Sequence, residues 1–234
     1  MLKTLRDDIR CVLDRDPAAR NALEVLLCYP GFRAVRSHRA AHWLHTHGLK
    51  GLARLESEWC RFFTGVDIHP AATVGKRLFI DHGLGVVIGE TTVIGDDVTL
   101  YQGATLGGTG KQTGKRHPTV GNHVTVSAGA SVLGPVTVGD YSKIGAGAVV
   151  LHDVPRGATV VGVPGHIVRR FGCPVPCGRD CDAAACAGDG CPAREGEAGV
   201  DLNVNDLPDP VQAQITALLA RIEALESASG GKEE

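Results

Sequence analysis

Aromatic residues are scarce in this sequence, and neither sign of charge is in large excess. Of the 234 residues 4% are aromatic, against 43% that are hydrophobic overall and 31 that are glycine. The formal net charge of −2 at pH 7 argues against nucleic acid and against an anionic membrane surface as partners. Thin aliphatic layers joined by many turns fit this composition better than a typical β-sandwich does.

Long apolar segments are also missing. No run approaches the ~20 residues that a membrane-spanning helix requires. Residues 1–10, MLKTLRDDIR, lack the apolar core of a signal peptide. We therefore expect a cytoplasmic protein, whose eight cysteines should be mostly reduced thiols.

Residues 2–63 have the spacing of helices. Apolar side chains recur three or four positions apart at Leu2, Leu5, Ile9 and Val12. Asp16-Pro17 is predicted to end this first helix and to place a proline in the first turn of the second. Two more helices are predicted over residues 32–48, with Gly48 as the stop, and over residues 50–63.

From Ile68 onward, aliphatic residues recur with a period of six. The thirteen positions are Ile68, Val74, Ile80, Ile88, Ile94, Leu100, Leu106, Val120, Val126, Val132, Val138, Ile144 and Val150. Glycine directly follows seven of them, which favours tight turns between short strands. This period predicts a parallel β-helix of hexapeptides, in which three repeats complete a triangular coil and the coils stack.

The repeat is interrupted twice. Ile80 and Ile88 are eight residues apart instead of six, and Leu106 and Val120 are fourteen apart. A solenoid accepts insertions only at its corners, and such loops commonly carry function. The first interruption contains Asp81 and His82, and the second ends in Arg116-His117.

These interruptions supply residues suited to acid–base chemistry and to anion binding. A neutral imidazole, here His82, can take a proton from a hydroxyl, and does so better beside a carboxylate. Asp67 precedes His82 by fifteen residues, close to the roughly eighteen of one coil, so both are expected at one edge. Arg116 offers a fork that fits a small carboxylate. The alternatives are a turn-capping Asp67, a solvated His82 and a solvated basic loop.

Two other groups of potential ligands have weaker patterns. His38, His42 and His45 share one helix face, but interleaved arginines and the lack of a carboxylate argue against a metal site. Five cysteines cluster in a Gly- and Pro-rich stretch: Cys173, Cys177, Cys181, Cys186 and Cys191. Their spacing differs from the C-x₂-C of zinc knuckles, so exposed thiols are the default and a metal or redox role the alternative.

The last segment has a heptad pattern. Val211, Ile215, Leu218, Ile222 and Leu225 alternate four and three apart, like the a and d positions of a coiled coil. About two heptads are marginal alone, so such a helix would gain stability by association, and a threefold axis would suit it.

A series of short motifs resembles serine O-acetyltransferases, the hexapeptide-repeat enzymes that open cysteine biosynthesis. These motifs are RDP at 15–17, HWL at 42–44, VDIHP at 66–70, IDHG at 80–83, VIGET at 87–91, TLGGTGK at 105–111, KRHP at 115–118, KIGAGAVV at 143–150 and GVPGHIVRR at 162–170. The resemblance implies an α+β fold: a helical N-terminal domain, a left-handed parallel β-helix of hexapeptide repeats and a C-terminal helical tail. The expected domains are 1–65, helical; 66–171, the acyltransferase β-helix; 172–205, a Cys-, Gly- and Pro-rich linker; and 206–234, an amphipathic helix.

The resemblance also implies roles for individual residues. The reaction would move acetyl from acetyl-CoA to the hydroxyl of L-serine, with no metal. His82 would be the general base and Asp67 its partner. The other implied contacts are Asp16 and Asp81 with serine, Arg116 and His117 with its carboxylate, and Gly108, Ala128, Lys143 and Ala146 with CoA. Glu90 matches an acid near the site.

Partners follow from the same resemblance. Family members are inhibited by L-cysteine and form trimers or dimers of trimers, so a homo-oligomer is expected. The helical domain is shorter than in long members, which leaves a plain trimer open. This chain ends GGKEE instead of the isoleucine that long members insert into O-acetylserine sulfhydrylase, which argues against that complex.

Three alternatives remain at this stage. A metal-dependent lyase of the γ-carbonic anhydrase kind would use His82, His117 and His123, although that type places two ligands five residues apart and here the gap is six. A non-catalytic β-helix would need no imidazole at position 82. A related acyltransferase would use homoserine or a sugar as acceptor.

Overall fold

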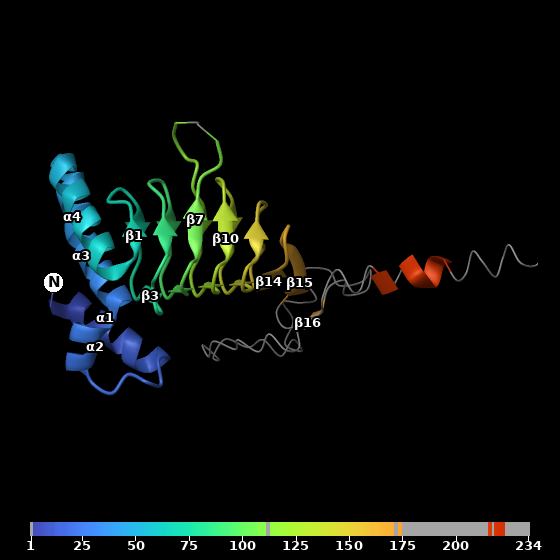
Figure 1. Cartoon of the computed structure of the whole chain (residues 1–234), viewed down its shortest axis with the longest axis horizontal. Helices are drawn as coiled ribbons and strands as arrows, with labels where there is room; N and C mark the ends of the chain where they lie inside the picture. Colours follow the sequence, from blue (N-terminus) through green and yellow to red (C-terminus); the bar gives the residue numbers. More distant parts are fainter. Residues whose placement is uncertain (1, 111–112, 171–172, 175–214, 217, 223–234) are drawn as a thin grey trace, which may run out of the picture. The chain divides into compact units, whose positions relative to one another are not determined.

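The computed structural model describes residues 2–110, 113–170, 173–174, 215–216 and 218–222. Contacts divide the chain into two compact units, Met1–Asp201 and Leu202–Glu234. In the first unit, helices precede a stack of short parallel strands (Figure 1). This is the predicted α+β fold with a left-handed β-helix. No helix in the ranges above combines the length and the apolar character needed to cross a membrane.

The N-terminal part contains four helices in the described residues. They are α1 (Leu2–Arg15), α2 (Ala22–Cys28), α3 (Pro30–Thr46) and α4 (Lys50–Thr64). The prediction that Pro17 starts the second helix is wrong. The Asn21 side chain accepts the Glu24 N–H at 2.9 Å, and this cap starts α2 at Ala22, which leaves Pro17 in the preceding turn.

Each of the thirteen predicted aliphatic positions is the second residue of a strand. The strands of the repeat are β1 (Asp67–Ile68), β2 (Thr73–Val74), β3 (Phe79–Ile80), β4 (Val87–Ile88), β5 (Val93–Ile94), β6 (Thr99–Leu100), β7 (Thr105–Gly107), β8 (Thr119–Val120), β9 (Thr125–Val126), β10 (Ser131–Leu133), β11 (Thr137–Val138), β12 (Lys143–Ile144) and β13 (Val149–Val150). They form three parallel sheets: sheet A is β1-β4-β7-β10-β13, sheet B is β11-β8-β5-β2, and sheet C runs from β3 through β6, β9 and β12.

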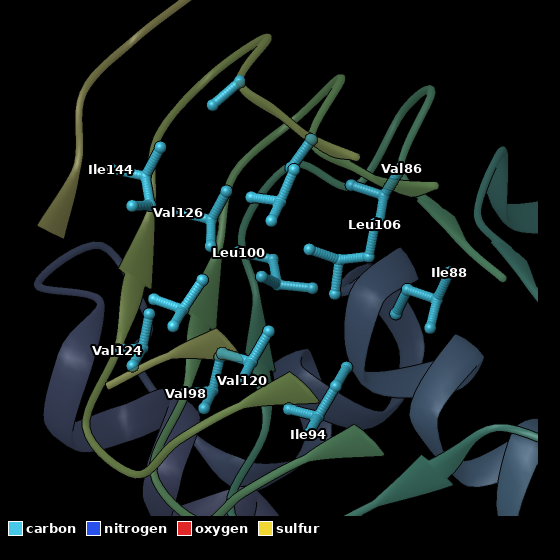
Figure 2. Packing of buried hydrophobic residues seen from close by; sticks show 14 of the residues in the cluster. Val86, Ile88, Ile94, Val98, Leu100, Leu106, Val120, Val124, Val126 and Ile144 are labelled. Atoms are coloured by element: carbon cyan, nitrogen blue, oxygen red, sulfur yellow. The ribbon is translucent and has the colours of Figure 1, made fainter. Parts of the chain in front are cut away.

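The strand register stacks like side chains on one another. In sheet A, Ile68 faces Ile88, which faces Leu106, and the other two sheets repeat this pattern. The labelled valine, leucine and isoleucine side chains come from all three sheets and, for Val86, Val98 and Val124, from the turns, and they point into one interior (Figure 2). Burying each such side chain fully contributes about 1.5–3 kcal/mol, which makes this interior the main source of stability.

The turns between sheets form three edges along the stack. The C/A edge holds the turns from sheet C to sheet A, including residues 81–86, 101–104, 127–130 and 145–148. The A/B edge includes residues 89–92 and the long loop 108–118, and the B/C edge includes residues 95–98, 121–124 and 139–142. As predicted, both interruptions lie at edges, the first at C/A and the second at A/B. The loop after β7 leaves the stack in Figure 1.

The end of the β-helix differs from the repeat. After β14 (Ala158–Val161) the chain reverses into β15 (His166–Arg170) and β16 (Cys173–Pro174), which pair antiparallel. The sequence pattern did not predict this ending. The predictions for Cys177, Cys181, Cys186 and Cys191 lie outside the described residues.

The second unit is described only in part. Residues 215–216 and 218–222 are helical, and the side chains of Ile215, Leu218 and Ile222 are exposed there. The remainder of the predicted helix 206–234 lies outside the described residues.

Polar contacts hold the helices to the first coils of the β-helix. Arg15 at the end of α1 forms an ion pair with Asp97 at 2.8 Å and donates to the Thr99 hydroxyl at 3.1 Å. In α4, the Ser57 hydroxyl donates to the Ile68 carbonyl at 2.9 Å. The Arg15 contacts place Asp16, the next residue, beside the β-helix.

Candidate active site

A backbone ladder organises the C/A edge. In each coil one N–H donates at 2.9 Å to the turn of the preceding coil. The pairs are Gly85 to Gly65, Gly103 to Leu84, Gly129 to Gln102 and Gly147 to Ala128. The interrupted turn, with His82, therefore stacks in line with the turns that carry Ala128 and Ala146.

His82 occupies an unusual backbone position on this edge. Its φ is +58°, in the left-handed region that side chains disfavour. The other coils place one glycine in that region, at Gly103, Gly129 and Gly147, whereas the first interruption has Gly83 and Gly85 there as well as His82. The interruption is two residues longer than the other turns and has two more left-handed positions than they have. This longer turn holds an imidazole outside the stack, 73% exposed, with Nε2 3.9 Å from Asp81 Oδ2.

Asp67 lies one coil before His82, as the spacing predicted. It starts β1, pairs with Val87, and its N–H donates to the Val86 carbonyl at 2.9 Å. No hydrogen bond joins its carboxylate to His82 in the part of the chain that the structure describes. Their partnership in catalysis stays a prediction.

Two carboxylates and two phenols gather next to this turn. The Tyr29 hydroxyl donates to Asp16 Oδ2 at 2.6 Å, and Asp16 Oδ1 accepts the Ala18 N–H at 2.8 Å. Burial raises the pKa of Tyr29 to about 12, helped by the bond to Asp16 and by the charge of Asp81. Burial and the charge of Asp81 also raise the pKa of Tyr101. Asp16 and Asp81 thus act on the same two phenols, and this negative corner suits an ammonium group.

At the A/B edge, Arg116 faces Glu90. Its Nη2 atom lies 2.5 Å from Glu90 Oε2, and this bond lowers the pKa of Glu90. Within the described ranges, the other guanidinium nitrogen atoms of Arg116 have no protein hydrogen-bond partner. Glu90 therefore holds the Arg116 guanidinium group on one side, and its other N–H donors remain available for a carboxylate.

His117 is packed into the same edge and is 8% exposed. A Cβ at Gly89 would lie 2.0 Å from its ring, and a Cβ at Gly108 would lie 3.3 Å from Nε2, so two glycines make room for the imidazole. Thr91 contacts the opposite ring nitrogen, Nδ1, with its hydroxyl at 2.9 Å. Burial and then the Arg116 charge lower the pKa of His117, which favours a neutral ring.

The predicted site residues therefore fall into two groups in one chain. Asp16, Asp67, Asp81, His82, Ala128 and Ala146 lie at or beside the C/A edge, and Lys143 begins β12 just before it. Gly108, Arg116 and His117 lie at the A/B edge. The strand between the edges takes about 10 Å at roughly 3.3 Å per residue, more than a free amino acid spans between its hydroxyl and its carboxylate.

The histidines considered as metal ligands lie apart. His82, His117 and His123 are on three different edges. His42 Nδ1 donates to the Pro70 carbonyl at 2.8 Å, and His38 is buried. Among the described residues, no group of three or more His, Cys, Asp or Glu side chains is arranged to hold a metal.

Sequence reasoning missed three residues of these clusters, Tyr29, Tyr101 and Thr91. Tyr29 bonds to Asp16, which is thirteen residues earlier, and no sequence pattern links the two positions. Thr91 contacts residues 25 and 26 positions later, across the long loop. Its place directly after Glu90, inside a motif, was the only available signal.

Family models match two segments of the chain. The model described as "Bacterial transferase hexapeptide (six repeats)" matches residues 117–152. The model described as "Serine acetyltransferase, N-terminal" matches residues 1–37.

Whole-chain comparisons give the same family. A serine acetyltransferase of Synechococcus elongatus is 51% identical over 97% of this chain and 83% of its own. A solved serine acetyltransferase of Brucella abortus in complex with coenzyme A is 46% identical, with a TM-score of 0.71 over 74% of this chain and 69% of that one. A serine acetyltransferase solved in complex with cysteine is also 46% identical, with a TM-score of 0.71. That match covers 72% of this chain and 66% of the other, just under two thirds of its length.

Proposed function

Since the chain belongs to the serine acetyltransferase family of acyltransferases, we propose that it transfers acetyl from acetyl-CoA to the hydroxyl of L-serine. The products are O-acetyl-L-serine and CoA, and the reaction opens cysteine biosynthesis in the cytoplasm. The observation that carries this proposal is the exposed imidazole of His82, held beside Asp81 on the edge that also bears Ala128 and Ala146.

His82 is the general base. Its neutral Nε2 takes the hydroxyl proton while the serine oxygen attacks the thioester carbonyl carbon of acetyl-CoA. The tetrahedral intermediate collapses, the C–S bond breaks, and the proton passes from the imidazolium to the departing sulfur. Asp67 supports the imidazolium from the neighbouring coil. A backbone N–H in the cleft stabilises the oxyanion, and no metal takes part.

Serine is held through both its ammonium group and its carboxylate group. Asp16 and Asp81 form the negative corner that takes its ammonium group, close to the base. Arg116 and His117 take the carboxylate through the donors that face away from Glu90 and Thr91. L-cysteine has the same ammonium and carboxylate groups, so it competes for this site and inhibits the enzyme. The family member solved with cysteine supports this.

The two edges of one chain are too far apart to hold one serine, so a neighbouring copy completes the site. The C/A edge of one β-helix faces the A/B edge of the next, and a ring of three closes this head-to-tail contact. We therefore take a trimer as the minimal assembly, which either stays alone or pairs into a dimer of trimers.

CoA lies along the C/A edge. Ala128, Lys143 and Ala146 line this path, and Gly108 from the facing edge contributes as well. The edge is open on its outer side, since a Cβ at Gly129 or Gly147 would meet nothing within 4 Å. Small residues there let an extended thioester arm approach the backbone closely. Residues 66–171 are then the catalytic domain, joined to the helical domain 1–65 that supplies Asp16.

Thiol release from acetyl-CoA tests the proposal. The assay compares release with and without L-serine for the wild type, His82→Ala and His123→Ala. His123 is a matched control, because it is also exposed and has a positive φ of +55°, but lies on the B/C edge. We expect serine-dependent release that falls by about 10²-fold or more in His82→Ala and stays unchanged in His123→Ala. Equal activity of all three proteins would contradict the role of His82.

The same assay separates the alternatives. Release with homoserine or a sugar, and none with serine, would keep the chemistry and change the acceptor. Loss of activity on treatment with a chelator would favour a metal-dependent enzyme.

A further inference from the structure

We propose that Thr91 is the positioning residue of the carboxylate clamp: its hydroxyl fixes Arg116 and His117 and sets the His117 proton on Nε2. This inference rests on the proposed function, because Arg116 and His117 bind serine only if serine is the substrate.

The Thr91 hydroxyl makes three contacts with two consecutive residues. Its Oγ1 atom accepts the backbone N–H of Arg116 at 3.1 Å and the backbone N–H of His117 at 3.1 Å. It also lies 2.9 Å from His117 Nδ1. A hydroxyl has one proton and two lone pairs. With both lone pairs taken by backbone N–H groups, its proton points to Nδ1.

A second contact agrees with this assignment. The Thr91 backbone N–H donates to the same Nδ1 at 3.2 Å. Nδ1 is therefore an acceptor of two donors and carries no proton, so the neutral ring has its proton on Nε2. Nε2 lies on the side of the ring away from Nδ1, against the backbone of Gly89 and beside Gly108. His117 thus presents a neutral N–H donor toward the end of the long loop where a carboxylate would sit.

The loop itself offers little else to fix these residues. Gly110 and Gly114 have φ values of +77° and +98°, and a Cβ at either would meet nothing within 4 Å. The chain returns to the stack through Lys115, whose ammonium group donates to the Thr91 carbonyl at 2.7 Å. Residues 115, 116 and 117 are thus all anchored on Thr91, which lies in the regular turn after β4.

A threonine hydroxyl can be removed with little change in shape. Thr91→Val therefore leaves the backbone N–H groups of Arg116 and His117 without this partner and Nδ1 with the Thr91 backbone N–H alone. The clamp binds the part of serine that does not react. Its loss should therefore raise the KM for L-serine while kcat and the KM for acetyl-CoA change little. We expect an increase in this KM of about ten- to a hundredfold.

Two further variants distinguish the loss of the hydroxyl from a change in side-chain shape. Thr91→Ser keeps the hydroxyl and should restore the KM for L-serine to within about threefold of the wild type. Thr137→Val makes the same change at an exposed strand position, where the hydroxyl makes no hydrogen bond with the described residues, and should match the wild type. The proposal is overturned if Thr91→Val has a wild-type KM, or if Thr91→Ser is as impaired as Thr91→Val.

An NMR measurement on the wild type keeps the test independent of variant folding and of turnover. Long-range ¹H–¹⁵N correlations of labelled histidine, assigned with His117→Gln, report which ring nitrogen carries the proton. We expect a bare Nδ1 and a protonated Nε2 for His117. A proton on Nδ1 would overturn the proposal even if the enzyme is active. A wild type without serine-dependent activity would instead refute the proposed function, while the proton position still tests the role of Thr91.

Discussion

The two interruptions of the β-helix carry histidines in opposite environments. His82 stands at the C/A edge with 73% of its side chain exposed, and its nearest charged partner is 3.9 Å away. His117 at the A/B edge is 8% exposed and is bonded through Nδ1 to both the N–H and the hydroxyl of Thr91. The same residue type is therefore open to solvent in one interruption and packed and hydrogen-bonded in the other.

This difference suits the exposed His82 to proton transfer and the packed His117 to binding. A general base must change its protonation state in every cycle, so contact with the substrate suits it better than a buried, saturated ring. A carboxylate clamp needs a fixed geometry, and burial against Gly89 and Gly108 provides it. In the proposed function each edge has one task, and a neighbouring copy would bring the two edges to one serine.

Disturbing the packing of the fixed histidine should have the largest effect. Gly89→Ala places a methyl group 2.0 Å from the His117 ring, so the ring has to move. We expect the KM for L-serine to rise by about a hundredfold. Steady-state kinetics check this, with Gly51→Ala as the control, because a Cβ at Gly51 in α4 meets nothing within 4 Å. An unchanged KM would show that the position of His117 is unimportant.

A histidine that is buried outside the site should instead change how stability depends on pH, and His38 is the example. Burial lowers the pKa of His38 from its usual 6.5 to about 4. Between these values the unfolded chain takes up a proton that the folded chain excludes, so stability falls as pH falls. We expect a loss of about 2 kcal/mol between pH 7 and pH 5. Urea unfolding at one protein concentration measures it.

The matched variant for this prediction is His38→Gln, which cannot titrate. Over the same pH range, its free energy of unfolding should fall by about 2 kcal/mol less than that of the wild type. If the free energies of unfolding of the two proteins change in parallel with pH, the lowered pKa of His38 is contradicted.

A smaller effect is expected from the hydrogen bond that orients Asp16. Tyr29→Phe removes the 2.6 Å bond to Oδ2 but leaves the Ala18 N–H on Oδ1. The carboxylate keeps one anchor, so the KM for L-serine should rise only about three- to tenfold, with little change in kcat. Tyr141→Phe, on the B/C edge, is the control in the same kinetic assay. If Tyr29→Phe and Tyr141→Phe have the same KM for L-serine, Tyr29 has no part in binding serine.

Much of the fold could be predicted because its physical cause repeats. Every sixth residue from Ile68 to Ile80, and again from Ile88 to Leu106, must fill the same interior, so strands and edges follow from spacing. The start of α2 could not be predicted from Pro17, because the Asn21 cap competed with it. The antiparallel end after β14 has no period and therefore gave no signal.

The site was only partly predictable for a related reason. The interruptions identified His82 and Arg116 as candidates, and the resemblance added roles for them. Neither showed that the two lie at different edges of one chain, because that depends on which corner each insertion occupies. The network around Thr91 depends on contacts across the long loop, and one threonine among many has no pattern of its own.

The most direct test of the division between the edges is the equilibrium dissociation constant of L-serine, measured by calorimetry for two variants. His82→Asn should bind L-serine within about threefold of the wild type, because the base acts on the reacting hydroxyl. Arg116→Gln should bind it at least about tenfold more weakly, because the clamp is lost. Weak binding by His82→Asn together with normal binding by Arg116→Gln would contradict the account.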